Sequence, residues 1–106
     1  MNSQEKHILD LIKSKIHEKD PDAELILFGS HARGTANKDS DWDILILITA
    51  PNVSRKTEQE YRHELFDVEL DTGEPISTFV YSKSEWETRY SVTPLYHNIS
   101  IEGIRL

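Results

Sequence analysis

The sequence predicts a small α/β protein (α+β), because short apolar runs alternate with segments of helical periodicity. Two runs indicate buried strands: Glu24–Phe28 is too short for an ordinary helix, and Asp43–Thr49 lacks the alternation of a half-exposed strand. The segment Ser3–Lys19 indicates an amphipathic helix. The expected order is helix, strand, short helix, strand, helix, strand, helix, helix. A chain of 106 residues is expected to form a single domain, residues 1–106.

The first half of the chain is expected to contain the centre of the sheet. The first helix, Ser3–Lys19, ends before Asp20-Pro21-Asp22, and its apolar stripe consists of three isoleucines at four-residue intervals, Ile8, Ile12 and Ile16. A helical turn or two is expected over Ser30–Ala36, because Gly34 limits any longer helix there. The uninterrupted apolar run Asp43–Thr49 is typical of a strand covered on both faces, so it is expected to be central.

The second half begins with a helix predicted from Thr57-Glu58-Gln59-Glu60, which has the form of a capping box. This helix is expected to end near Asp71. Residues Pro75 to Tyr81 are rich in β-branched and aromatic side chains and therefore predict a third strand.

Two short helices are expected to follow. A second capping box, Ser82-Lys83-Ser84-Glu85, opens a helix through Trp86. Thr93-Pro94 is an N-cap followed by proline at the first helical position, and Gly103 is placed to end that helix. Trp42 and Trp86 are expected to fill the core or a subunit contact, and no spacing supports a role in stacking on an adenine.

Composition excludes several kinds of function. The 12 basic and 19 acidic side chains give a formal charge of −7, which argues against binding nucleic acid directly through its phosphates. Cysteine is absent, so thiolate chemistry and disulfides are excluded. No apolar run approaches the roughly 18 residues that span a membrane, and the N-terminus lacks a hydrophobic secretory segment. We therefore expect a cytoplasmic protein without a membrane partner.

A candidate phosphate site lies between the first strand and the helical turn. Gly29 and Ser30 offer backbone N–H groups and a hydroxyl to an anion, with no side chain at Gly29 to block its approach. Arg33 follows three residues later, so on a helical turn its guanidinium can reach the same end and bind a phosphate oxygen. Taken alone, a Gly-Ser pair is more often an ordinary turn.

A candidate metal site follows in Ser40-Asp41-Trp42-Asp43. Asp41 and Asp43 are two residues apart on an extended chain, so their carboxylates project from one face while Trp42 points to the other. Paired carboxylates repel each other unless a cation lies between them, and hard oxygen ligands suit Mg²⁺ or Mn²⁺. A lone pair of aspartates is often only a solvated strand entry. The joint order of the Gly-Ser loop, the arginine and the aspartates favours a site that binds a nucleoside triphosphate with a metal.

These residues carry a family resemblance. The run Gly29–Ala36, followed by Ser40–Ile44, resembles the signature of the minimal nucleotidyltransferases in the DNA polymerase beta superfamily, and Ile99–Ile104 is similar to the closing segment of the same proteins. The resemblance implies a small mixed β-sheet backed by helices, the polymerase beta-type fold. It also implies a triphosphate held at Gly29 and Ser30, metal ions held by Asp41 and Asp43, and transfer of a nucleotide, usually AMP from ATP.

Many proteins of this family are antitoxins of toxin–antitoxin pairs, so the resemblance implies a HEPN-domain toxin as partner and a tyrosine hydroxyl as acceptor. Active members carry a third carboxylate on the next strand, but Pro75 to Tyr81 contains no acid. Glu74, at the start of that strand, is the candidate to replace it. Glu69 or Asp71 would qualify only if the preceding segment were extended. General-base help is typically worth about 10²–10⁴-fold, so its loss would lower the transfer rate.

Three functions therefore remain open from the sequence. The first is a metal-dependent nucleotidyltransferase that acts on a protein hydroxyl. The second is a catalytically weak or inactive nucleotide-binding antitoxin that neutralises its partner by binding it. The third is a nucleotide-sugar site, for which 106 residues leave little room for an acceptor. A homodimer or a hetero-oligomer is plausible on size alone.

Overall fold

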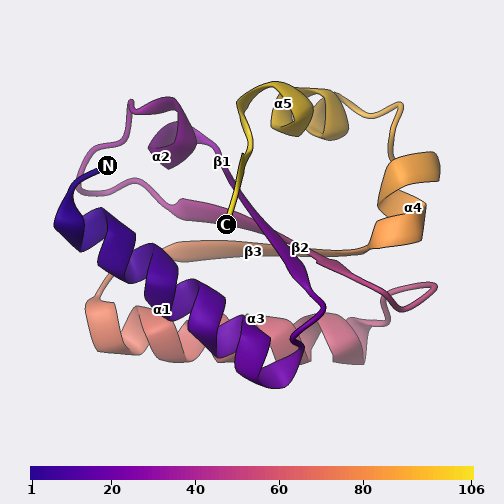
Figure 1. Ribbon diagram of the computed structural model, residues 1–106, viewed down its shortest axis with the longest axis horizontal. Helices are drawn as coiled ribbons and strands as arrows, with labels where there is room; N and C mark the ends of the chain where they lie inside the picture. Colours follow the sequence, from indigo (N-terminus) through magenta and orange to yellow (C-terminus); the bar gives the residue numbers. More distant parts are fainter.

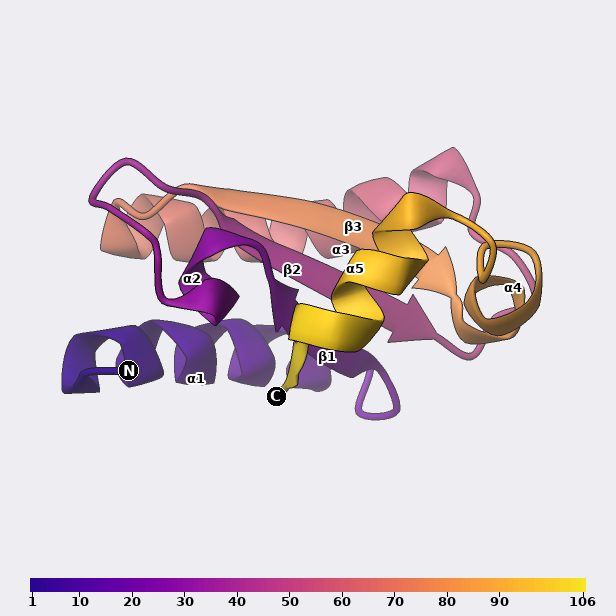
Figure 2. The same cartoon turned by 90° about the horizontal axis from the view of Figure 1, so that it is seen from above.

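The computed structural model describes residues 1–106 as a four-stranded mixed sheet between two groups of helices (Figures 1 and 2). In Figure 1, α1 and α3 lie below the sheet, while α2 and α5 lie above it and α4 lies at one end. The elements are α1 (Ser3–Lys19), β1 (Glu24–Phe28), α2 (Ser30–Arg33), β2 (Trp42–Ile48), α3 (Arg55–Thr72), β3 (Ile76–Ser82), α4 (Lys83–Thr88), α5 (Pro94–Glu102) and β4 (Ile104–Arg105). No helix is long and apolar enough to span a membrane.

The strands are ordered β3-β2-β1-β4. Strand β1 is antiparallel to both β2 and β4, whereas β2 and β3 run parallel. Helix α3 makes the crossover that a parallel pair requires. The mixed sheet and the central position of β2 are thereby confirmed.

Two cores explain why β2 shows no alternation in sequence. Ile44, Ile46 and Ile48 face the larger core, which α1 and α3 complete. Leu45 and Leu47 face a smaller core, to which α4 and α5 contribute. Because both faces of β2 are covered, consecutive residues are apolar. The two tryptophans fill the core as predicted, Trp42 on the α1 side and Trp86 on the α4 side.

Helix α3 begins earlier than the sequence pattern predicted. Its N-cap is Ser54, whose Oγ accepts a hydrogen bond from the backbone N–H of Thr57 at 3.1 Å. Thr57 is therefore a residue of the first turn, and the prediction that it opens the helix is wrong. Ser54 satisfies one of the N–H groups that every helix start leaves without a partner, which makes it the better cap.

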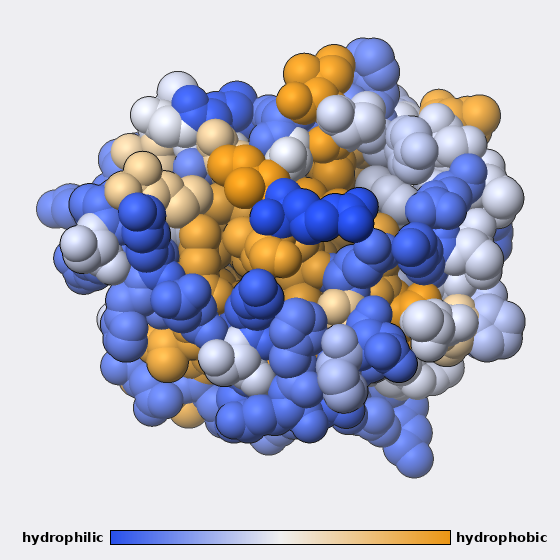
Figure 3. Space-filling view, in the orientation of Figure 1, coloured by the Kyte–Doolittle hydropathy of each residue, from blue (hydrophilic) through white to orange (hydrophobic).

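Strand β4 was not predicted. Gly103 ends α5 as expected, with its N–H bonded to the Ile99 carbonyl at 2.8 Å. The chain then runs alongside β1, where the Leu106 N–H donates to the Leu25 carbonyl at 2.9 Å. An apolar area lies in the middle of the face that carries α1 and the C-terminus (Figure 3). Ile104 of β4 is 41% exposed.

Candidate functional site

The loop after β1 allows a carboxylate from β2 to approach the backbone. Gly29 has a left-handed φ of 75°, a conformation that residues with a side chain rarely adopt. A Cβ placed on Gly29 would collide with Oδ2 of Asp43. Glycine therefore serves two purposes here, the turn itself and the space for Asp43. Ser30 follows as the first residue of α2.

The register of the sheet brings Asp43 to this loop. Asp43 lies opposite Phe28 of β1 and opposite Ser77 of β3. Asp41, just before β2, is exposed, and its Oδ2 accepts a hydrogen bond from Ser77 Oγ at 2.8 Å. Asp41 and Asp43 thus lie at one end of the sheet, beside Gly29, and Ser77 is the β3 residue next to them.

The two aspartates and their surroundings hold an excess of negative charge. Burial is the main cause that raises the pKa of Asp43 above its ordinary value, and the charge of Asp41 raises it further. The charges of His31 and Arg33 oppose this shift without cancelling it. A carboxylate that is costly to ionise beside another carboxylate is a group that a cation would stabilise.

Arg33 lies at the loop, but it is already paired. Its Nη1 donates to both oxygens of Glu102, at 3.0 Å to Oε2 and 3.3 Å to Oε1. The backbone N–H of Gly29 donates to the same Oε1 at 3.2 Å. Glu102, the last residue of α5, is thus a site residue to which the sequence analysis assigned no role. Its place in the closing motif Ile99–Ile104 was the available signal.

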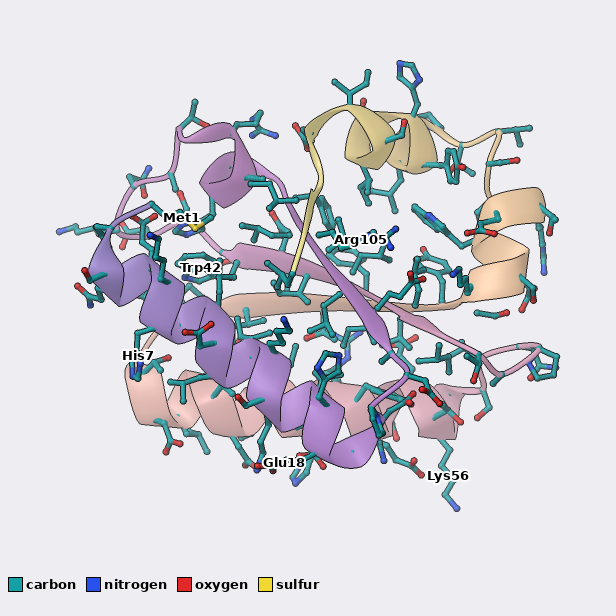
Figure 4. The ribbon with its side chains drawn as sticks, in the orientation of Figure 1. Met1, His7, Glu18, Trp42, Lys56 and Arg105 are labelled. Carbon is teal, nitrogen blue, oxygen red and sulfur yellow. The ribbon has the colours of Figure 1, made fainter.

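Glu74 lies on the other side of β2 from the carboxylate pair. Its Oε2 accepts a hydrogen bond from Trp42 Nε1 at 3.3 Å, and Trp42 lies between β2 and α1 (Figure 4). The ring of His31 stacks on Trp42 with centroids 3.7 Å apart. The structure therefore does not bring Glu74 together with Asp41 and Asp43, because alternate residues of a strand point to opposite faces.

The preceding segment supplies no third carboxylate either. Residues 69 and 71 belong to α3, so the segment is not extended. Glu69 Oε1 instead accepts a hydrogen bond from the backbone N–H of Ile76 at 2.6 Å. No group of three or more histidine, cysteine or acidic side chains lies close enough to hold a metal ion.

The two aspartates nevertheless fit a magnesium ion that is shared with a nucleotide. Mg²⁺ is usually bound by one or two carboxylates, with waters and substrate phosphates completing its shell. Asp41 and Asp43 supply the two carboxylates, and the raised pKa of Asp43 indicates a local need for positive charge. These residues would hold the ion, and Gly29 and Arg33 carry the donors for a phosphate.

Anion donors beside paired carboxylates are the arrangement of enzymes that bind nucleotides together with a divalent cation. The family model described as the nucleotidyltransferase domain matches residues 9–103, nearly the whole chain. The chain belongs to this family of nucleotidyltransferase domains.

Solved structures with the same fold come from toxin–antitoxin complexes. A toxin–antitoxin structure with AMP-PNP matches with a TM-score of 0.66 at 21% identity, over 91% of this chain and 69% of that chain. A MntA-HpeT toxin–antitoxin mutant with two aspartate-to-glutamate changes matches with a TM-score of 0.60 at 20% identity, over 99% and 72% of the two chains. These matches show that the chain shares the fold of those two chains. Comparison with curated proteins found no match.

Proposed function

We propose that this protein is a metal-dependent nucleotidyltransferase of the antitoxin type, which transfers AMP from ATP to a tyrosine hydroxyl of a HEPN-type toxin partner. The observation that carries the nucleotide site is the contact of Asp43 with the Gly29 loop, which joins carboxylates and anion donors in one place. The structural neighbours support the setting, since they are toxin–antitoxin complexes and one was solved with AMP-PNP. We infer a cytoplasmic location, where ATP and Mg²⁺ are available for the proposed reaction.

Each residue has a defined part in this proposal. Gly29, Ser30 and Arg33 bind and orient the triphosphate, and Asp41 and Asp43 hold the magnesium ion. When bound, the ion neutralises charge on the triphosphate and on the pyrophosphate as it leaves. The tyrosine oxygen forms a bond to the α-phosphorus, the bond from that phosphorus to the bridging oxygen breaks, pyrophosphate leaves, and the tyrosine proton passes to solvent water.

Calorimetric titration of ATP, with and without Mg²⁺, tests the nucleotide site. The double variant Asp41→Asn/Asp43→Asn is expected to lose metal-dependent binding while it keeps its fold. The matched control is Asp10→Asn/Asp67→Asn, which removes two charges from α1 and α3, away from the site. Equal affinity of the wild type and the site variant would refute the proposal.

A second candidate function is supported by Ser77. Ser77 lies opposite Asp43 and bonds to Asp41, so the position beside the carboxylate pair carries a hydroxyl where an acid could stand. A hydroxyl is a weaker metal ligand and a poor general base. The second candidate is therefore an antitoxin that binds nucleotide with little or no transfer and neutralises its partner by covering it.

Two experiments separate these candidates. In cells that express the toxin partner, the Asp41→Asn/Asp43→Asn variant should fail to protect if transfer is required, and should protect fully if binding is enough. The variant Ser77→Asp adds a third carboxylate to the pair. If the lack of a third carboxylate limits the transfer rate, Ser77→Asp should raise that rate by about 10²-fold or more, and Ser77→Ala should not.

A further inference from the structure

The last residue of α5 occupies the donors that a phosphate would use. Glu102 Oε1 accepts from the Gly29 N–H at 3.2 Å, and both Glu102 oxygens accept from Arg33 Nη1. The side chain of Glu102 is only 20% exposed, whereas that of Arg33 is 50% exposed. The contact joins residues 69 and 73 positions apart in the sequence, so it fastens the end of the chain to the loop after β1.

We propose that Glu102 is an internal anion that competes with the nucleotide phosphates for Gly29 and Arg33. This inference rests on the proposed function, because it concerns the same donors. A backbone N–H makes one strong hydrogen bond at a time, so a phosphate oxygen at Gly29 excludes the Glu102 oxygen. A carboxylate left beside a bound triphosphate would also repel it. Nucleotide binding therefore requires Glu102 to leave, and its presence lowers the affinity of the empty site.

The release of Glu102 requires movement of its side chain only. A Cβ on the next residue, Gly103, would lie 2.5 Å from the Ile99 carbonyl oxygen and 2.8 Å from Cγ2 of Ile26. The backbone after Glu102 is therefore closely packed, and β4 beyond it is paired with β1. Rotation of the flexible glutamate side chain frees Gly29 and Arg33 without unpairing β4.

The variant Glu102→Gln tests this competition. Glutamine keeps the length of the side chain and an oxygen that can accept from Gly29, but it removes the negative charge. Titrations with Mg²⁺–ATP and with inorganic tripolyphosphate should both show tighter binding than the wild type, on the order of tenfold. The control is Glu87→Gln, which makes the same charge change on α4, and its affinity should equal that of the wild type.

The outcomes distinguish the inference from the function on which it rests. Wild-type binding of Mg²⁺–ATP with equal or weaker binding by Glu102→Gln would overturn the competition and leave the proposed function standing. Failure of both proteins to bind Mg²⁺–ATP would overturn the proposed function and the inference with it. If Glu102→Gln does not fold, Glu102→Asp replaces it. Aspartate keeps the charge that repels the triphosphate but shortens the reach to Gly29 and Arg33, so a gain in affinity smaller than tenfold is the expected result.

Discussion

Gly29 has to lack a side chain because Asp43 comes close to its Cα, and this requirement can be tested directly. The variant Gly29→Ala forces a Cβ into a backbone conformation that is essentially restricted to glycine, φ 75° with ψ −158°, and into Oδ2 of Asp43. The backbone conformation by itself costs an alanine about 1–3 kcal/mol. We expect a larger loss of unfolding free energy than that, because Asp43 must also move, together with loss of Mg²⁺–ATP binding. Urea unfolding and calorimetry measure the two effects.

Gly34 provides a control for positive φ without a close neighbour. Its φ of 77° and ψ of 18° lie in the ordinary left-handed helical region, and no atom lies within 4 Å of where its Cβ would be. Gly34→Ala should therefore lose about 1–2 kcal/mol from backbone strain and keep nucleotide binding. Similar losses for the two variants would show that the close approach of Asp43 is not what requires glycine at position 29.

The charge of Asp43 makes stability depend on pH in a defined direction. Its pKa is higher in the folded protein than the ordinary value of 3.8, mainly because of burial. The folded state therefore holds the proton of Asp43 more tightly, and the contribution of this group to stability is lost as the pH rises from 3.8 through the folded pKa. In the presence of a chelator, Asp43→Asn should be more stable than the wild type at neutral pH.

This advantage should shrink as the pH is lowered toward 3.8, because the wild-type carboxyl then becomes neutral as well. Urea unfolding of both proteins at several pH values measures it. A difference that stays constant over the whole range would mean that the asparagine acts through packing and not through charge.

The residues of the site also show how much of its geometry can be predicted from the sequence. The two-residue spacing of Asp41 and Asp43 predicted a shared face because strand geometry fixes the direction of alternate side chains. Strand geometry could not predict that Ser77 and Glu102 lie beside these aspartates, because both residues come from segments far along the chain. Only the register of β2 with β3 and the packing of α5 bring them to the loop.

Among the elements, α3 offers a test of where a helix begins. Ser54 Oγ accepts from the N–H of Thr57 and also donates to Thr57 Oγ1 at 3.0 Å. Ser54→Ala should lower the unfolding free energy by about 1 kcal/mol, a typical loss for an N-cap. Thr57→Ala should cost less, because Thr57 lies inside the first turn. Urea unfolding compares the two, and the reverse order would restore Thr57 as the cap.

Elements with a strong local pattern were predicted well, and β4 was not. Helix α1 begins and ends at the predicted residues because its isoleucine stripe and the following Asp-Pro-Asp act locally. Strand β4 has only two residues, too few to show any period. It exists because Ile104 and Arg105 pair with β1, and such pairing is a property of the folded chain.

At the scale of the whole molecule, β2 is the element that both cores share. Periodicity alone indicated that β2 is covered on both faces, but it could not say which helices cover which face. The family resemblance supplied the mixed sheet that the structure confirms. Strand order depends on contacts between distant segments, and a local pattern carries no information about them.

The shared strand predicts that the two cores unfold together. Leu45 and Ile46 are both fully buried but face opposite cores, so Leu45→Ala and Ile46→Ala should each cost about 2–5 kcal/mol.

The tryptophans report on the cores separately, because Trp42 lies in one and Trp86 in the other. In a variant that keeps only one tryptophan, fluorescence reports on one core and circular dichroism on the whole chain. The two signals should give the same urea midpoint in Trp42→Phe and in Trp86→Phe, as cooperative unfolding requires. Separate midpoints would show that the α4–α5 side unfolds on its own, and that β2 does not couple the two faces.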